Sequence, residues 1–275
     1  MRTSVDSDNK LTMLAQMSND AKFQVLEYDR LSGGLDIKTA LCLNIINDAD
    51  IRLRQVRIIL QDSAVKLEIG SLSYMKGDIS IRTKEHGLLE LGKKFLKGKA
   101  TGENLIKPTY KGTGEIFLEP SFGYYALIEL EDDEIIVDDG MFYACEDSVQ
   151  VEVSMQRTIS SIALGNKGVF QTKLKGSGIV VLELPVPESE IFRCKLNNDV
   201  LKVDGDFVVL RTGNIEFSVQ KSSSVIGSMS NGEGFLNVYS GTGEVWILPT
   251  KTTYEDLEID GLKNIIGLDE NNAKE

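Results

Sequence analysis

Three stretches decide the predicted fold: GTGEIFLEP at 112–120, GSGIVVLELP at 176–185 and GTGEVWILP at 241–249. In each of them a Gly-x-Gly step opens an apolar run that a proline closes. The three steps begin 64 and 65 residues apart. A constant spacing with the same punctuation indicates a repeated supersecondary element. We therefore predict three diverged repeats of one β element of roughly 65 residues.

A second motif keeps the same spacing and reads LQDSAVKLEIG at 60–70, LEDDEIIVDDG at 130–140 and LNNDVLKVDG at 196–205. Each begins with leucine, continues through polar residues into an alternating run, and ends in glycine. This pattern is typical of a hairpin tip that leads into a half-buried strand and a tight turn. Nine glycines are predicted to be structural positions of the repeat: Gly70, Gly112, Gly114, Gly140, Gly176, Gly178, Gly205, Gly241 and Gly243.

The predicted fold class is all-β, an antiparallel β-prism or barrel-like sandwich of three pseudo-threefold repeats. One short inserted helix is expected near 88–98, where Leu88, Leu91 and Phe95 have helical spacing. The polar segment before Phe23 is expected to be helical or disordered. The predicted organisation is an N-terminal extension at 1–22, a single β domain at 23–250 with repeats at about 23–118, 119–184 and 185–250, and an acidic tail at 251–275 able to form a short helix.

The composition narrows the classes of partner. The net charge is −12, from 42 acidic and 30 basic residues, and it repels the phosphate backbone of nucleic acids and anionic membranes. Two basic groups alternate with apolar residues and are interpreted as solvated faces. No apolar run reaches the roughly 18 residues of a membrane span. The basic groups are Arg52, Arg54 and Arg57, and Lys93, Lys94, Lys97 and Lys99.

The cysteines Cys42, Cys145 and Cys194 lie far apart, without the spacing of a zinc site or a disulfide framework. We interpret them as small buried hydrophobic residues in a reducing compartment. The N-terminal residues lack the apolar core of a secretory signal. Together these features predict a cytoplasmic protein.

No set of residues predicts catalysis, a cofactor or a metal. His86 is the single histidine and lies in a polar turn, so a histidine-based triad or a multi-histidine metal site cannot form within one chain. The acidic run Glu131–Glu134 could in principle bind a cation, but it lacks spaced ligands and is interpreted as a hairpin tip. The Gly-x-Gly steps precede strands, whereas a phosphate-binding loop precedes a helix. We expect a protein that is not an enzyme.

The turn at Val137–Gly140, the Met141–Ala144 strand, the Gly232–Gly234 step and the GTGEVW motif resemble the altered-inheritance-of-mitochondria protein twenty-four family, described as having a fold like the trp RNA-binding attenuation protein. The resemblance runs from about Phe23 to Pro249. It implies a pseudo-threefold β-prism and a link, in eukaryotic members, to the organisation of the mitochondrial inner membrane. It supplies no catalytic residues. The family's Gly-Glu step is present at Gly102-Glu103 and Gly232-Glu233, while the middle repeat has Gly165-Asn166.

Two functions are consistent with this sequence. The first is a non-enzymatic interaction or scaffold protein whose partner is itself, as a homo-oligomer, or another protein. The alternative is a small-ligand or lipid-headgroup binding module with a pocket near the pseudo-threefold axis, where the three glycine turns would converge.

Overall fold

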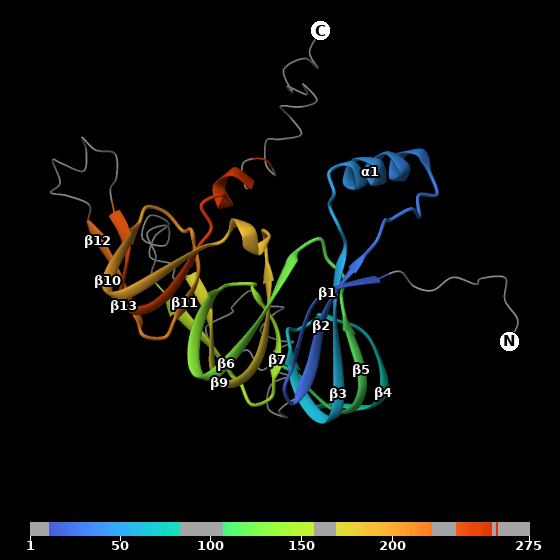
Figure 1. Ribbon diagram of the computed structural model, residues 1–275, viewed down its shortest axis with the longest axis horizontal. Coiled ribbons are helices and arrows are strands. Elements are labelled where there is room, and N and C mark those ends of the chain that lie inside the picture. The colour runs from blue at the N-terminus through green and yellow to red at the C-terminus, as the bar shows by residue number, and fades with distance from the viewer. Residues whose placement is uncertain (1–10, 83–106, 157–168, 222–234, 255–256, 258–275) are drawn as a thin grey trace, which may run out of the picture. The chain divides into compact units, whose positions relative to one another are not determined.

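The computed structural model describes residues 11–82, 107–156, 169–221, 235–254 and 257. Within them the chain is mostly β, and its strands pair antiparallel (Figure 1). It divides into two compact units, one formed by Met1–Met155 with Phe170–Pro187, the other by Gln156–Val169 with Glu188–Glu275. Each unit is described by itself.

Unit 1 is built on the long strands β3, β6 and β9. The order of its paired strands is β1-β2-β3-β7-β9-β6; β5 also pairs with β3, β4 with β5, and β8 with β9. One helix, α1 (Ile37–Asp48), lies between β2 and β3. The strands are β1 (Leu11–Ser18), β2 (Ala21–Tyr28), β3 (Arg54–Leu67), β4 (Leu72–Arg82), β5 (Thr109–Leu118), β6 (Tyr124–Asp138), β7 (Phe142–Glu146), β8 (Gln150–Gln156) and β9 (Val169–Leu184).

Alternating side chains of these strands form the core of unit 1. Phe23, Ile58 and Ile116 are fully buried and come from β2, β3 and β5, which pair side by side. Ile179 and Val181 of β9 belong to the same cluster. Burial of such side chains stabilises each by about 1.5–3 kcal/mol, so the inward face of the sheet holds unit 1 together.

Unit 2 is centred on β13 (Phe235–Ile247), with which three other strands pair antiparallel. They are β10 (Phe192–Val203), β11 (Val208–Thr212) and β12 (Ile215–Lys221), and a 3-10 turn at Glu188–Glu190 precedes β10. Leu196, Ile215 and Val245 are among the residues of its core.

The polar stretches interpreted as hairpin tips lie inside continuous strands, so that interpretation is wrong. In β3, β6 and β10 the register shifts between Leu60 and Ser63, between Leu130 and Asp133, and between Asn197 and Asp199. Each shift is a β-bulge, in which an extra residue faces solvent. An exposed bulge selects the same polar residues as a tip, so composition does not separate the two.

One hydrogen bond recurs at the three bulges. A residue with positive φ, Asp62, Asp132 or Asn198, donates its backbone N–H to the hydroxyl in the middle of the facing Gly-x-Gly step. The acceptors are Thr113 at 3.0 Å, Ser177 at 2.9 Å and Thr242 at 2.9 Å. The Gly-x-Gly steps thus lie in mid-strand, opposite the bulges of β3, β6 and β10.

The nine predicted glycines all have positive φ. Gly112 shows why a side chain is excluded at one of them: a Cβ there would lie 2.0 Å from the backbone oxygen of Asp78 on β4. Gly70, Gly140 and Gly205 follow the ends of β3, β6 and β10. The pseudo-threefold prism as a whole stays a prediction.

Two further expectations about local structure change. The expectation of helix or disorder before Phe23 is wrong for Leu11–Ser18, which forms β1 and pairs with β2. Helix α1 was not predicted. The helix expected near 88–98 lies outside the described residues, as does most of the tail, of which residues 251–254 form a helical turn.

Candidate interaction site: helix α1 and its polar base

Helix α1 has well-defined ends. Asp36 is its N-cap: one carboxylate oxygen accepts the Thr39 backbone N–H at 2.9 Å and the other accepts the Thr39 hydroxyl at 2.7 Å. The hydrogen bond from the Thr39 N–H lowers the pKa of Asp36. At the other end Ala49 donates to the Ile45 carbonyl at 2.9 Å. The helix is therefore fixed by local contacts, and Figure 1 shows it standing away from the strands of unit 1.

One side of α1 is an exposed apolar stripe, which we define as Ile37, Leu41 and Ile45. These side chains are 82%, 61% and 67% exposed. They recur every four residues, so they lie one above another along the helix. Leu35, just before the N-cap, is also fully exposed. The result is a continuous aliphatic surface in contact with water.

The opposite side of α1 rests on the loop that precedes it. Leu43, Ile46 and Asn47 are half-buried, and the Asn47 side-chain amide donates to the Leu31 carbonyl at 3.0 Å. Apolar residues thus occupy both sides of the helix. A helix that is apolar on all sides is normally buried on all sides.

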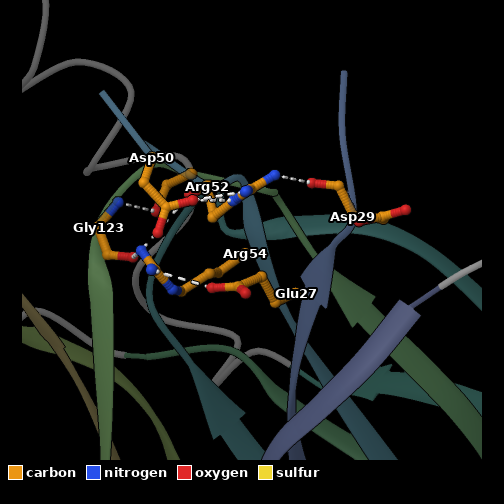
Figure 2. Close-up of polar contacts among 7 residues, drawn as sticks. Glu27, Asp29, Asp50, Arg52, Arg54 and Gly123 are labelled. Carbon is orange, nitrogen blue, oxygen red and sulfur yellow. Dashed lines mark hydrogen bonds and ion pairs between the residues drawn. The ribbon is translucent and has the colours of Figure 1, made fainter. Parts of the chain in front are cut away.

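Arg52 ties the C-terminal end of the α1 segment to β2 (Figure 2). Its guanidinium donates to Asp50 at 2.8 Å and to the Asp29 carbonyl at 2.7 Å. Asp50 has a positive φ of 54° and begins the return of the chain toward β3. The contact closes the two ends of the insertion, because Asp29 follows β2 and Arg52 precedes β3.

Arg54 anchors the same region more deeply, in β3 (Figure 2). Its Nη2 lies 3.0 Å from a carboxylate oxygen of Glu27, and its guanidinium lies 4.2 Å from the ring centroid of Tyr124. Its backbone exchanges hydrogen bonds with Ser121 at 2.7 and 2.9 Å. Arg54 is 9% exposed, so the interpretation of this arginine as a solvated residue is wrong. A buried guanidinium persists because an acid and a ring face replace its water.

Arg57, the third arginine of this group, lies beside Glu115 at 3.0 Å and over Phe117 at 5.6 Å. All three guanidinium groups therefore contact acidic partners within unit 1. The described residues include none of the four lysines at 93–99.

The remaining candidates are placed as follows. Asp132 occupies the bulge of β6, and Glu134 pairs with Lys173 at 2.8 Å. The described part of the chain contains no group of three His, Cys, Asp or Glu residues suited to a metal. His86 and the Gly-Glu steps at 102–103 and 232–233 lie outside that part.

The three cysteines have different environments. Cys145 is buried, Cys194 is half-buried, and Cys42 is exposed on α1, so the interpretation of all three as buried is wrong for Cys42. Burial raises the pKa of the Cys145 thiol to about 12. Among the described helices, none combines the length and apolar character needed to cross a bilayer.

Sequence reasoning missed one buried acid, Glu146 at the end of β7. Its carboxylate is fully buried and accepts the backbone N–H of Ala21 at 2.8 Å, that of Ile179 at 3.0 Å and the side-chain amide of Asn19 at 3.0 Å. Gly178 leaves room for it, since a Cβ there would lie 2.9 Å from the carboxylate. Glu146 is thus a structural tie between the β1–β2 hairpin, β7 and β9.

Comparisons with known proteins agree with this architecture. Over 233 residues the chain is 23% identical to the uncharacterized protein M6_Spy0233 of Streptococcus pyogenes serotype M6, covering 82% of this chain and 91% of the relative. The crystal structure of protein SPYM3_0169 from Streptococcus pyogenes superposes with a TM-score of 0.53 at 22% identity, covering 76% of this chain and 94% of the other. The likeness shows a shared fold.

The family described as Mitochondrial biogenesis AIM24 matches residues 47–250. The match begins at the C-terminal end of α1 and includes β3 to β13. It spans most of the chain and includes all three Gly-x-Gly strands. The chain therefore belongs to the AIM24 family.

Proposed function

We propose that this chain is a non-enzymatic interaction or scaffold protein that binds a protein partner through helix α1. The observation that carries the proposal is the exposed stripe of Ile37, Leu41 and Ile45 on a helix whose other side already packs on its own loop. Aliphatic side chains gathered in this way on a soluble protein mark interaction surfaces. The β sheet serves as the support.

The support for α1 has the strength that such a role requires. Arg52 joins the two ends of the insertion, and Arg54 pairs with Glu27 and Tyr124 beneath it. An anchored helix loses little conformational freedom on binding, and this lowers the cost of association. The same geometry would be superfluous for a loop without a partner.

We extend the proposal to the β body, as a pseudo-threefold prism of three repeats. It is supported by the recurrence of the bulge hydrogen bond from Asp62, Asp132 and Asn198 to a hydroxyl of the facing Gly-x-Gly step. Three such bonds at a constant sequence spacing are expected from a repeated β element.

A photo-crosslinking experiment tests the interaction role. Leu41 is replaced by p-benzoylphenylalanine in cells that produce the full chain, and the matched control places the same residue at the exposed position of Gln61. We expect ultraviolet light to yield protein adducts from position 41 and few from position 61. Adducts with lipid alone, or equal adducts from both positions, would contradict the proposal.

A further inference from the structure

We propose that the partner of α1 is a second copy of this chain, whose own α1 packs antiparallel against the stripe. This inference rests on the proposed interaction role and names its partner. It starts from the exposed surface of Ile37, Leu41 and Ile45, which contacts no other described part of unit 1 closely enough to be buried.

The charges of α1 favour a self-complementary, antiparallel pair. The helix sequence IKTALCLNIIND contains one cation, Lys38, in its first turn and one anion, Asp48, at its last residue. Both are exposed, and they are about 15 Å apart along the helix axis. Lys38 flanks the stripe and Asp48 continues its line, because residues three and four apart share a helix face.

An antiparallel copy centred near Leu43 brings these charges together twice. Lys38 of each copy then lies opposite Asp48 of the other, and Leu41 opposite Ile45. A parallel arrangement instead sets lysine against lysine and aspartate against aspartate. The antiparallel arrangement also places the positive end of each helix dipole beside the negative end of the other. A two-fold interface of this kind is the commonest in protein assemblies.

The charge pattern argues against a membrane as the occupant. Helices that lie in a lipid surface carry many lysines and arginines on their polar face, whereas α1 has a single lysine. The net charge of −12 repels an anionic leaflet as well. A second copy of an equally acidic chain is also repelled at long range, but here the contact itself carries balanced charge.

The expected association is weak and depends on concentration. A helix of 12 residues is about 18 Å long, so a pair of them buries less than the roughly 1,200 Å² of a standard interface. We therefore expect a monomer at low concentration and a dimer at tens to hundreds of micromolar, of the order found for small transient interfaces.

The test uses the full chain in sedimentation velocity and light scattering over that concentration range. The wild type is expected to approach twice the chain mass of 30.4 kDa. The variant Leu41→Ser/Ile45→Ser should weaken association at least about tenfold, because two buried aliphatic side chains are lost. Circular dichroism and the melting temperature should stay unchanged, since these side chains are exposed in the single chain.

Charge reversal identifies the partner as a copy. Lys38→Asp and Asp48→Lys should each weaken association about fivefold or more, and the combined variant Lys38→Asp/Asp48→Lys should restore it to within about threefold of wild type. Lys76→Asp, at an exposed position of β4, makes the same change of net charge and should have no effect.

The outcomes separate this inference from the proposed function. A monomer at every concentration, with adducts from position 41 to a different protein, overturns the second copy and leaves the interaction role in place. A dimer that survives both the stripe and the charge variants overturns the inference too. Binding of the wild type to phosphatidylcholine vesicles that depends on Leu41 overturns both.

Discussion

Glu146 accepts the backbone N–H of Ala21 at 2.8 Å, although the two residues are 125 positions apart in the chain. The same carboxylate accepts the N–H of Ile179, so one buried side chain holds the ends of two distant strands.

Glu146→Ala should therefore destabilise unit 1 by about 3 kcal/mol, because two buried N–H groups lose their acceptor. Urea unfolding monitors the loss, and hydrogen exchange at Ala21 and Ile179 localises it. The control Glu146→Gln keeps one acceptor oxygen and should cost about half as much. Equal stability of Glu146→Ala and wild type would show that water replaces the carboxylate.

Gly112→Ala should be the most damaging of three matched glycine substitutions. Its Cβ would lie 2.0 Å from the Asp78 oxygen at a φ of 149°, so β4 and β5 must separate locally, at a cost of about 3 kcal/mol or more. Gly70→Ala has positive φ but open space and should cost about 1 kcal/mol. Gly33→Ala has neither restraint and should be neutral. Thermal melts of the three variants should follow this order, and any other order would refute it.

Arg54→Ala should destabilise unit 1 by about 3 kcal/mol, because it leaves Glu27 without its charge partner in a mostly buried site. Arg52→Ala removes a more exposed pair and should cost less than about 1 kcal/mol, while it loosens the base of α1. Chemical denaturation measures the first effect. Hydrogen exchange of the α1 amides measures the second, and unchanged exchange in Arg52→Ala would contradict the anchoring role.

The thiols should differ sharply in reactivity. Cys42 is exposed and should react with a maleimide within minutes at pH 8, whereas Cys145 should stay unmodified until the chain unfolds. Cys42→Ser is the control and should remove the fast phase as followed by mass spectrometry. A fast phase that persists in this variant would contradict the assignment.

Cys145 also gives unit 1 a dependence on alkaline pH. Burial raises its pKa from 9.0 to about 12, so the folded state favours the neutral thiol. The stabilisation is complete below pH 9 and is lost as the pH rises toward 12, by up to about 1.4 kcal/mol per pH unit. The free energy of unfolding of Cys145→Ala should fall less steeply over this window. Parallel slopes would rule the effect out.

The strands that carry the fold were accessible to sequence reasoning. The Gly-x-Gly runs form β5, β9 and β13, and they end within two residues of Pro120, Pro185 and Pro249. Proline stops a strand because it has no N–H for the ladder. Family membership followed from the same positions.

The missed elements share a physical cause, which is a broken or absent periodicity. In β1 a register shift between Met13 and Ala15 interrupts the alternation that marks a strand. In α1, aliphatic residues lie on both sides, so no polar face shows a helix period. Only Asp36 gave a local signal, as an N-cap.

Buried charges were missed for another reason. Arg54 and Glu146 look like surface residues in sequence, because the groups that satisfy them come from distant strands. Glu27 lies 27 residues from Arg54, and Ala21 lies 125 residues from Glu146. Pairing across such distances is a property of the folded sheet.

The reach of Glu146 has a consequence for how the chain is made. The β1–β2 hairpin leaves the ribosome first, yet Ile179, which shares its carboxylate partner, is translated 158 residues after Ala21. At roughly 5–20 residues per second, the nascent hairpin waits roughly ten to thirty seconds for this tie to form. During that interval its apolar face needs either the growing sheet or a chaperone to shield it.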